Sequence, residues 1–180
     1  TAAVVAEALP EILRNLPFPK KMRWGREREA FIRPVHWIVA LLGDAVVPFT
    51  FAGVTSDRRS WGHRFYRNEA VTVPADLDGY RSALAAARVQ VDPEVRRADI
   101  RRQVVALADG IGGTWVEDEE TLEIVTHLVE WPAALLGTFA REYLEIPAPV
   151  IRTTLRENQK LFTVQGPDGK LLDRFVAVAN

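Results

Sequence analysis

Helix start and stop signals in the middle of this chain constrain the fold more than any other feature of its sequence. Asp76 is a typical N-cap residue and predicts a helix directly after it. Pro93 predicts the start of a second helix, and the glycine-rich segment 110–113 predicts its end. Asp118 predicts a third helix that stops at Trp131-Pro132. The apolar positions expected to face inward in the third helix are Leu122, Val125, Leu128 and Val129.

Short β-rich segments and two hairpin signals surround these helices. Residues 31–42 and 45–51 are rich in β-branched and aromatic side chains and flank Gly43-Asp44, which is typical of a hairpin turn. Residues 160–165 and 170–179 flank a Gly-Pro-Asp-Gly turn and predict a second hairpin. Because strands and helices are interspersed without strict βαβ alternation, the sequence predicts an α+β fold with mixed or antiparallel sheets and packed helices.

The length of 180 residues predicts a single domain. Residues 2–15 have helical spacing, with a kink or break expected at Pro10, so we expect a helical lead-in over 1–19 and an α+β body over 20–180. The chain opens on threonine rather than methionine and stops directly after a strand-like segment. We therefore expect it to be an excised piece of a longer protein.

The composition excludes several kinds of function. The absence of cysteine excludes disulfides, thiolate catalysis and cysteine zinc sites, and it fits a reducing cytosol. The net charge of -1 argues against a chain that is basic throughout, although it permits a local basic patch. The longest apolar runs, such as 37–42, are far too short to span a bilayer, so we expect no membrane partner.

The three histidines, His36, His63 and His127, lack the spacing of a metal site. No pair forms an HxH or HExxH motif, so no zinc site is expected, and no serine lies in a GxSxG motif. The phosphate-binding patterns GxxxxGKS/T and GxGxxG do not occur either. We therefore expect no catalytic residue and no cofactor in this fragment.

Basic residues gather in three segments, 20–33, 58–67 and 152–160. Arginine binds phosphate through paired hydrogen bonds and stacks on bases, so the segments suit an RNA-binding surface; a solvated rim around a protein interface explains them equally well. Gly62 indicates a backbone position that a side chain would disturb. We expect the segment around it to be a loop that packs its aromatic side chains on a sheet edge. Four arginines scattered round the second helix are expected to be ordinary surface: Arg96, Arg97, Arg101 and Arg102.

Five motifs occur in order along nearly the whole chain. They are MRWG (22–25), FIRPVHWIVALLGDAVVPF (31–49), GHRF (62–65), LVEWPAALLGTF (128–139) and TLRENQKLFTV (154–164), and the chain ends on FVAVAN (175–180). Together they resemble the bacterial glycyl-tRNA synthetase β subunit. The resemblance implies that this fragment corresponds to the N-terminal part of that subunit.

The resemblance implies membership of a two-subunit enzyme that uses ATP to ligate glycine to its tRNA. In that family the α subunit holds the aminoacylation site, with ATP and magnesium, and the β subunit supplies tRNA binding. The implied partners of this cytoplasmic chain are the glycyl-tRNA synthetase α subunit, the tRNA for glycine and the remaining domains of the β subunit. The resemblance also implies a fold similar to the editing-type domain of the phenylalanyl-tRNA synthetase β subunit.

The residues expected to carry the function lie in two of the basic segments. Those expected to contact RNA phosphate or a neighbouring domain are Arg58, Arg59, Arg64, Arg152, Arg156 and Lys160. His63 is expected to order its loop through hydrogen bonds. One alternative is a hydrolytic editing domain with water positioned by His63, His36 or Glu157. Because glycine is the smallest amino acid, a synthetic pocket can exclude larger ones sterically, which weakens the need for a separate editing site. Another alternative is a purely structural spacer.

Overall fold

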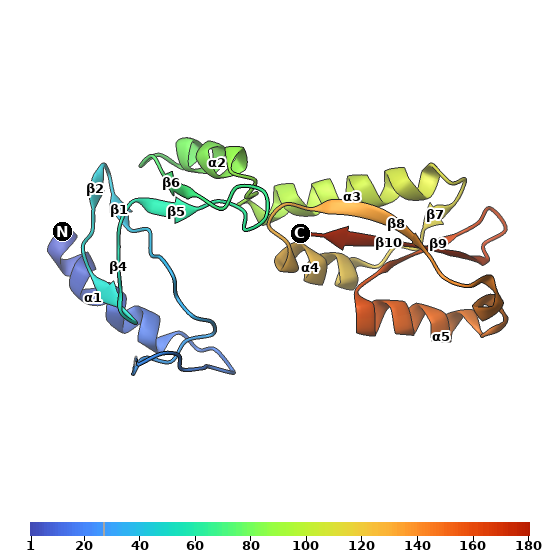
Figure 1. Cartoon of the computed structure of the whole chain (residues 1–180), viewed down its shortest axis with the longest axis horizontal. Coiled ribbons are helices and arrows are strands. Elements are labelled where there is room, and N and C mark those ends of the chain that lie inside the picture. The colour runs from blue at the N-terminus through green and yellow to red at the C-terminus, as the bar shows by residue number, and fades with distance from the viewer. Residues whose placement is uncertain (27) are drawn as a thin grey trace. The chain divides into compact units, whose positions relative to one another are not determined.

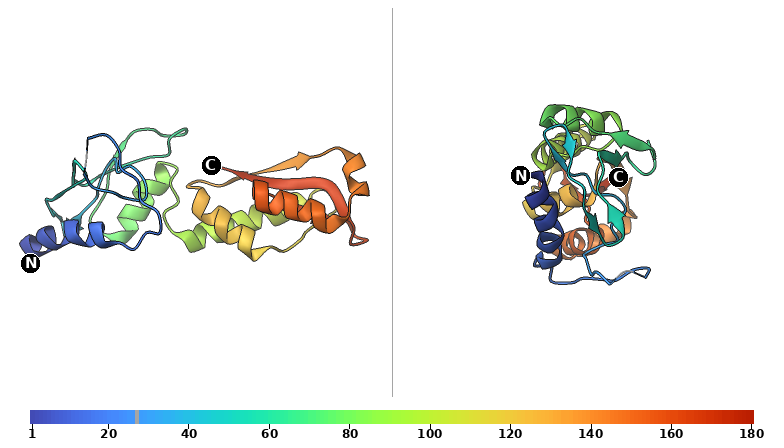
Figure 2. Two further views of the ribbon diagram at one scale, coloured as in Figure 1. Left: turned by 90° about the horizontal axis from the view of Figure 1, so that it is seen from below. Right: turned by 90° about the vertical axis from the view of Figure 1, so that its left-hand side faces the viewer.

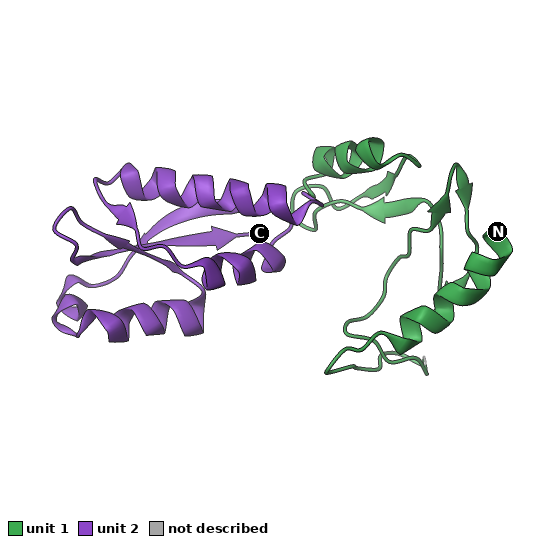
Figure 3. Cartoon of the chain, turned by 180° about the vertical axis from the view of Figure 1, so that it is seen from behind, with its two compact units in different colours: residues 1–89 green, residues 90–180 purple. Residues whose placement is uncertain are grey.

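A computed structural model describes residues 1–26 and 28–180, so Glu27 of the first basic segment lies outside the described residues. The chain divides into two compact units, Thr1–Val89 and Gln90–Asn180, which Figure 3 shows in green and purple. This division falls at a different place from the boundary predicted after the N-terminal helix. Whether the two units fold together as a single domain stays a prediction.

Unit 1 combines helices with three antiparallel hairpins of short strands, and each hairpin forms a two-stranded sheet (Figure 1). Its elements are α1 Ala2–Asn15, β1 Leu41–Leu42, β2 Ala45–Val46, β3 Thr50–Phe51, β4 Val54–Thr55, β5 Arg59–Trp61, β6 Ala70–Thr72 and α2 Leu77–Ala86. Helix α1, blue in Figure 2, includes Pro10. The ring of Phe31 meets those of Phe18 and Phe51 edge-on, at centroid distances of 5.0 and 5.5 Å. These contacts hold the irregular segment before β1 against the first hairpins.

The β-rich segments predicted at 31–42 and 45–51 form less strand than expected. The hairpin at Gly43-Asp44 is confirmed, but it joins strands of only two residues each. Residues 32–38, His36 included, lie outside the strands. Pro34 lacks a backbone N–H and therefore does not suit the middle of a strand.

The segment around Gly62 was expected to be a loop, and this expectation is wrong for part of it. Arg59–Trp61 forms β5, which pairs with β6 in the register Arg59↔Thr72 and Trp61↔Ala70. Residues 64–66, which follow, form a turn. The sequence did not predict this strand because its pairing partner, β6, lies in a later segment of the chain.

Unit 2 is built round a four-stranded antiparallel sheet in the order β7-β9-β10-β8. Its elements are α3 Pro93–Asp109, β7 Thr114–Trp115, α4 Glu119–Leu128, β8 Ala133–Thr138, a 3₁₀-helix η1 Arg141–Glu145, α5 Ala148–Thr153, a π-helix η2 Thr154–Asn158, β9 Phe162–Gln165 and β10 Leu171–Ala179. The hairpin predicted near the C-terminus is confirmed as β9–β10. Together the two units confirm the α+β class.

Helices α3 and α4 pack on this sheet and form the core of unit 2. Ile100 and Val104 of α3 and Leu122 of α4 are fully buried in one cluster with Phe162 and Val164 of β9. Helix α5 lies on the other side of the strands from α3 (Figures 1 and 3). Strands β8 and β7 form the two edges of the sheet.

Aspartate caps start the helices as predicted. The carboxylates of Asp76 and Asp118 each accept a hydrogen bond from the backbone N–H three residues later, at 2.6 and 2.9 Å. The expectation that Leu128 faces inward is wrong, because its side chain is 64% exposed. Helix α4 ends at this residue, and Val129 beyond the helix takes the buried position instead.

The two leucines of α4 provide a matched test of this packing. We expect Leu122→Ala to lower the free energy of unfolding by about 2–5 kcal/mol, because it removes fully buried methyl groups and leaves a cavity. Leu128→Ala, at the exposed end of the same helix, should change it by less than about 0.5 kcal/mol. Chemical denaturation followed by circular dichroism measures both, and equal losses would contradict the packing described.

Candidate functional site

Asp57 organises the backbone next to β5. Its N–H donates to the carbonyl of Ile38 at 2.9 Å, and its own carbonyl accepts from the N–H of Ala40 at 3.2 Å. Its carboxylate accepts from Nε of Arg59 at 2.5 Å and from the backbone N–H of Arg58 at 2.8 Å. These hydrogen bonds, that of the Arg59 side chain foremost, lower the pKa of Asp57 below its usual value. Asp57 therefore joins residues 38–40 to β5 and orients Arg59.

His63 caps the turn that follows β5. Its ring is buried, at 1% exposed, and Nδ1 accepts hydrogen bonds from the backbone N–H groups of Phe65 and Tyr66, at 3.2 and 3.4 Å. The carbonyl of His63 also accepts from the N–H of Arg67 at 2.9 Å. Because Nδ1 accepts, the proton of the neutral ring sits on Nε2. The histidine thereby orders the turn and leaves Arg64, Phe65 and Tyr66 exposed.

Gly62 lies where the turn meets the end of α2. A Cβ at this position would stand 2.2 Å from the carbonyl oxygen of Arg67 and 3.0 Å from the Cβ of Ala87. The neighbouring N–H of His63 donates to the carbonyl of Ala87 at 2.9 Å, which fixes this close approach. The sequence-based prediction that a side chain would disturb position 62 is confirmed.

The predicted phosphate-binding arginines of unit 1 differ in the hydrogen bonds and ion pairs that their guanidinium groups already make. Arg58 donates through its guanidinium to the carbonyl of Asp44, and Arg59 pairs with Asp57. Arg64 is exposed, and within the described ranges it makes no ion pair or hydrogen bond through its side chain. Arg64 is therefore the cation of this segment that is most available to an external anion.

The predicted basic residues of unit 2 lie among carboxylates. Arg156 pairs with Glu157 at 2.6 Å and approaches Asp118 to 4.0 Å, and Lys160 lies 3.8 Å from Glu157. The hydrogen bond that Arg156 donates to Glu157, together with the negative charge of that carboxylate, raises the pKa of Arg156. Nε of Arg152 is buried and has no hydrogen-bond partner among the described residues. This cluster carries less unbalanced positive charge than its sequence suggested.

The backbone of this cluster is unusual at two neighbouring places. Residues Thr154–Asn158 form a π-helix, a rare conformation that often marks functional segments. Lys160, two residues beyond, has a φ of 54°, in the left-handed region that non-glycine residues seldom occupy. Its N–H donates to the carbonyl of Arg156 at 3.1 Å, which closes the end of the helix.

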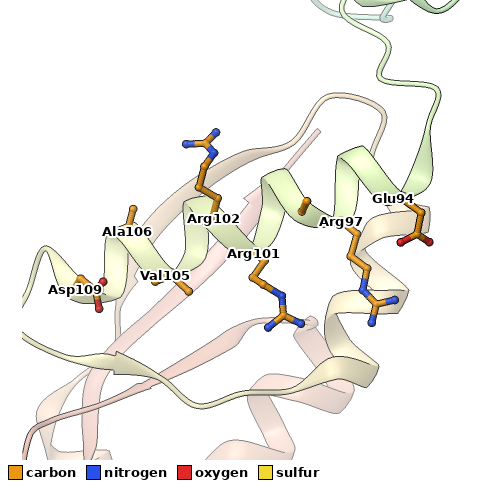
Figure 4. Close-up of a pocket in the computed structure, with 8 residues that line it drawn as sticks. Glu94, Arg97, Arg101, Arg102, Val105, Ala106 and Asp109 are labelled. Atoms are coloured by element: carbon orange, nitrogen blue, oxygen red, sulfur yellow. The ribbon is translucent and has the colours of Figure 1, made fainter.

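An open hollow of about 550 Å³ runs along α3. Figure 4 shows Arg97 and Arg101 pointing to one side of the helix and Arg102 pointing away from them. Glu119 accepts hydrogen bonds from Arg101 and from Arg97, and both arginines lower its pKa. Arg97 also pairs with Glu123 at 3.0 Å. These arginines are neutralised by acidic residues of α4, so the hollow is no strong anion site.

Sequence reasoning missed an exposed aromatic pair in unit 1. The rings of Trp37 and Trp61 lie 5.5 Å apart between centroids with an interplanar angle of 32°, and both side chains are partly exposed. Trp61 follows Arg59 by two positions in β5, a spacing that places both on one face of the strand. That alternation was the available signal, but it is visible only once the segment is known to be a strand.

The three residues suggested as alternatives for positioning a hydrolytic water differ in their surroundings. His36 and His63 belong to unit 1 and Glu157 to unit 2. His36 is exposed, the ring of His63 is buried as described, and Glu157 pairs with Arg156 and Lys160. In the part of the chain that the structure describes, no group of three or more acidic or histidine side chains is placed to hold a metal ion. None of the described helices has the length and apolar character needed to cross a membrane.

Comparison with known proteins places this structure in a family. The model of the family described as glycyl-tRNA synthetase beta subunit matches residues 1–180. A glycine--tRNA ligase beta subunit of Desulfatibacillum aliphaticivorans is 45% identical to the chain, and one of Desulforamulus reducens is 43% identical. Both matches cover 100% of this chain and 26% of the relative. A third such relative, from Xanthomonas campestris pv. campestris, is 44% identical over 99% of the chain and 26% of its own length.

The chain therefore belongs to the glycyl-tRNA synthetase β subunit family. It spans about a quarter of the length of the curated relatives that it matches. The resemblance seen in the sequence motifs is thus confirmed as family membership.

The close approach at Gly62 can be tested by adding one methyl group. We expect Gly62→Ala to destabilise the protein by about 1–3 kcal/mol, because the new Cβ would overlap the carbonyl of Arg67. Gly110→Ala is the matched control, since its nearest contact would be 3.2 Å and its backbone is helical. It should change the free energy of unfolding by less than about 0.5 kcal/mol. Urea denaturation compares the two, and a Gly62→Ala variant as stable as the wild type would show that the approach is not close.

Proposed function

We propose that this chain is a tRNA-binding, noncatalytic part of a glycyl-tRNA synthetase β subunit. It would support the ATP-dependent ligation of glycine to its tRNA by a complex whose aminoacylation site is on the α subunit. The observation that carries the proposal is the exposed turn with Arg64, in a chain that the family model matches throughout. Arginine in an exposed turn is well suited to bind RNA phosphate.

The partners and cofactors follow from this assignment. We propose that the α subunit, the tRNA for glycine and the remaining domains of the β subunit are the partners of this chain in the cytoplasm. ATP and magnesium would bind the α subunit and not this fragment. The names of the relatives, which are glycine--tRNA ligase beta subunits, support the assignment.

The predicted basic residues of the two units would contribute differently to RNA binding. Arg64 would contact phosphate directly, while Arg58 and Arg59, already held by neighbouring acceptors, would add to the local positive potential. The unit 2 group of Arg152, Arg156 and Lys160 would contact tRNA or a neighbouring domain. Because Glu157 and Asp118 offset its charge, we expect its contribution to RNA affinity to be smaller than that of Arg64.

An editing activity is the less favoured reading. The resemblance of the fold to the editing-type domain of the phenylalanyl-tRNA synthetase β subunit stays a prediction. His63 is buried with Nδ1 engaged by the turn, and Glu157 pairs with Arg156 and Lys160, so neither is placed as a free group for positioning water. A deacylation assay with mischarged tRNA addresses this reading, and hydrolysis by the purified chain would overturn the noncatalytic assignment.

Salt-dependent binding tests the role of Arg64. We expect Arg64→Gln to weaken tRNA binding roughly threefold to tenfold at about 0.1 M salt and to reduce the slope of log K against log salt by about 1, because one phosphate contact is lost. Arg102→Gln is the matched control, since Arg102 is an exposed arginine of unit 2 that pairs with Asp99. It should leave affinity and slope as in the wild type. Absence of tRNA binding by the wild-type chain would favour the structural spacer.

Charge reversal tests the basic group of unit 2. We expect the double variant Arg156→Glu and Lys160→Glu to weaken tRNA binding and to reduce its salt slope, because two cations become like charges toward the phosphates. Fluorescence anisotropy with labelled tRNA over a range of salt concentrations measures both quantities. An unchanged affinity and slope would remove this group from the RNA surface and leave it as an interdomain contact.

A further inference from the structure

The outer face of the β5–β6 hairpin exposes an aromatic side chain beside a cation. Ser60 is buried, whereas Arg59 and Trp61 on either side of it are exposed and share the opposite face. The residues across from them in β6 are Thr72 and Ala70, which are also exposed and carry small side chains. The indole of Trp61 therefore has no bulky cross-strand neighbour on this face.

Trp37 extends this face. Its ring lies 5.5 Å from that of Trp61, with 43% of Trp37 and 36% of Trp61 exposed. The backbone pairing of residues 38–40 with Asp57 holds Trp37 next to the start of β5. Two large rings are thus fixed together at the surface and remain partly open to solvent.

Exposed aromatic residues continue into the turn that His63 caps. Phe65 is 78% and Tyr66 is 53% exposed, and Arg64 lies beside them. Between residues 57 and 69 there are four arginines and two carboxylates, in a chain whose net charge is -1. Aromatic and cationic side chains are therefore interspersed along a segment with a net positive charge.

This combination fits single-stranded nucleic acid better than a lipid or a purely apolar protein partner. Unpaired bases stack on exposed aromatic rings, and neighbouring arginines bind the phosphates between them. Paired bases hide their faces within a helix and offer only phosphates and groove edges. A purely apolar partner would have to desolvate Arg64 without supplying a compensating charge.

We propose that Trp37 and Trp61 form a stacking platform for unpaired nucleobases of RNA, with Arg64 binding an adjoining phosphate and Arg59 adding to the positive potential. The proposal rests on the tRNA-binding function proposed above and specifies that the RNA segment at this surface is single-stranded. Asp57 serves the platform by orienting Arg59 and by holding the segment that carries Trp37.

The test compares ligands that share phosphates but differ in their bases. The full chain is titrated with a single-stranded oligoribonucleotide of about ten nucleotides, the site size of one small binding module. The two comparison ligands are an abasic oligomer of equal phosphate number and an RNA duplex. Trp61→Ala should weaken binding of the base-containing single strand roughly 5- to 100-fold and leave binding of the abasic oligomer unchanged. Trp61→Phe should retain part of the affinity, because phenylalanine still offers a ring.

Matched controls separate stacking from loss of structure. Tyr143 of η1 is another exposed aromatic residue, and Tyr143→Ala should bind all three ligands like the wild type. Trp37→Ala should reproduce the ligand preference of Trp61→Ala. The thermal unfolding curve of each variant shows whether the fold is kept, and the abasic oligomer reports an intact phosphate surface.

The outcomes distinguish this proposal from the function on which it rests. If the wild type binds tRNA but the tryptophan variants bind the single strand with wild-type affinity, the platform is wrong and the tRNA-binding function stands. If the wild type binds neither tRNA nor the single strand, the proposed function fails together with the platform. If Trp61→Ala weakens only the association with the α subunit, the surface is a protein interface, and the platform is overturned.

Discussion

The backbone of Asp57 joins residues 38–40 to β5, and the exposed surface of unit 1 depends on this joint. One residue donates to the carbonyl of Ile38, accepts from the N–H of Ala40 and holds the guanidinium of Arg59 with its carboxylate. Without these bonds the segment that carries Trp37 would have few regular contacts, since residues 32–38 lie outside the strands. The acidic residue in this basic segment thus serves to position its neighbours, in addition to reducing the net charge.

Helix boundaries could be predicted from the sequence because their causes are local. An aspartate that caps the N–H groups of the next turn, or a proline in the first turn, acts within a few residues, and α2, α3 and α4 begin where these signals stand. Strands between 31 and 61 were less predictable. The partner of β5 lies in a later segment, so the existence of β5 does not follow from its own residues, and Pro34 does not suit the longer strand that was expected before Gly43.

The sequence predicted which residue types make up the candidate site. It did not predict which of its cations are already paired with carboxylates. The basic segments and the demand for glycine at position 62 are visible in the sequence. Which cations are already paired depends on contacts such as Arg97 with Glu119, which are 22 residues apart, and Arg156 with Asp118. The stacking of Trp37 on Trp61 depends in the same way on a pairing between distant segments. Tertiary structure therefore decides which basic and aromatic residues are available to a ligand.

Lys160 is subject to two demands that oppose each other. Its left-handed backbone suits glycine, which would relieve the strain, whereas the position of its ammonium near Glu157 suits a long cationic side chain. Replacing Lys160 with glycine would stabilise the backbone and remove the positive charge. Replacing it with a β-branched residue would remove the charge and leave the backbone strained. Substitution at this site is therefore a compromise between backbone conformation and charge.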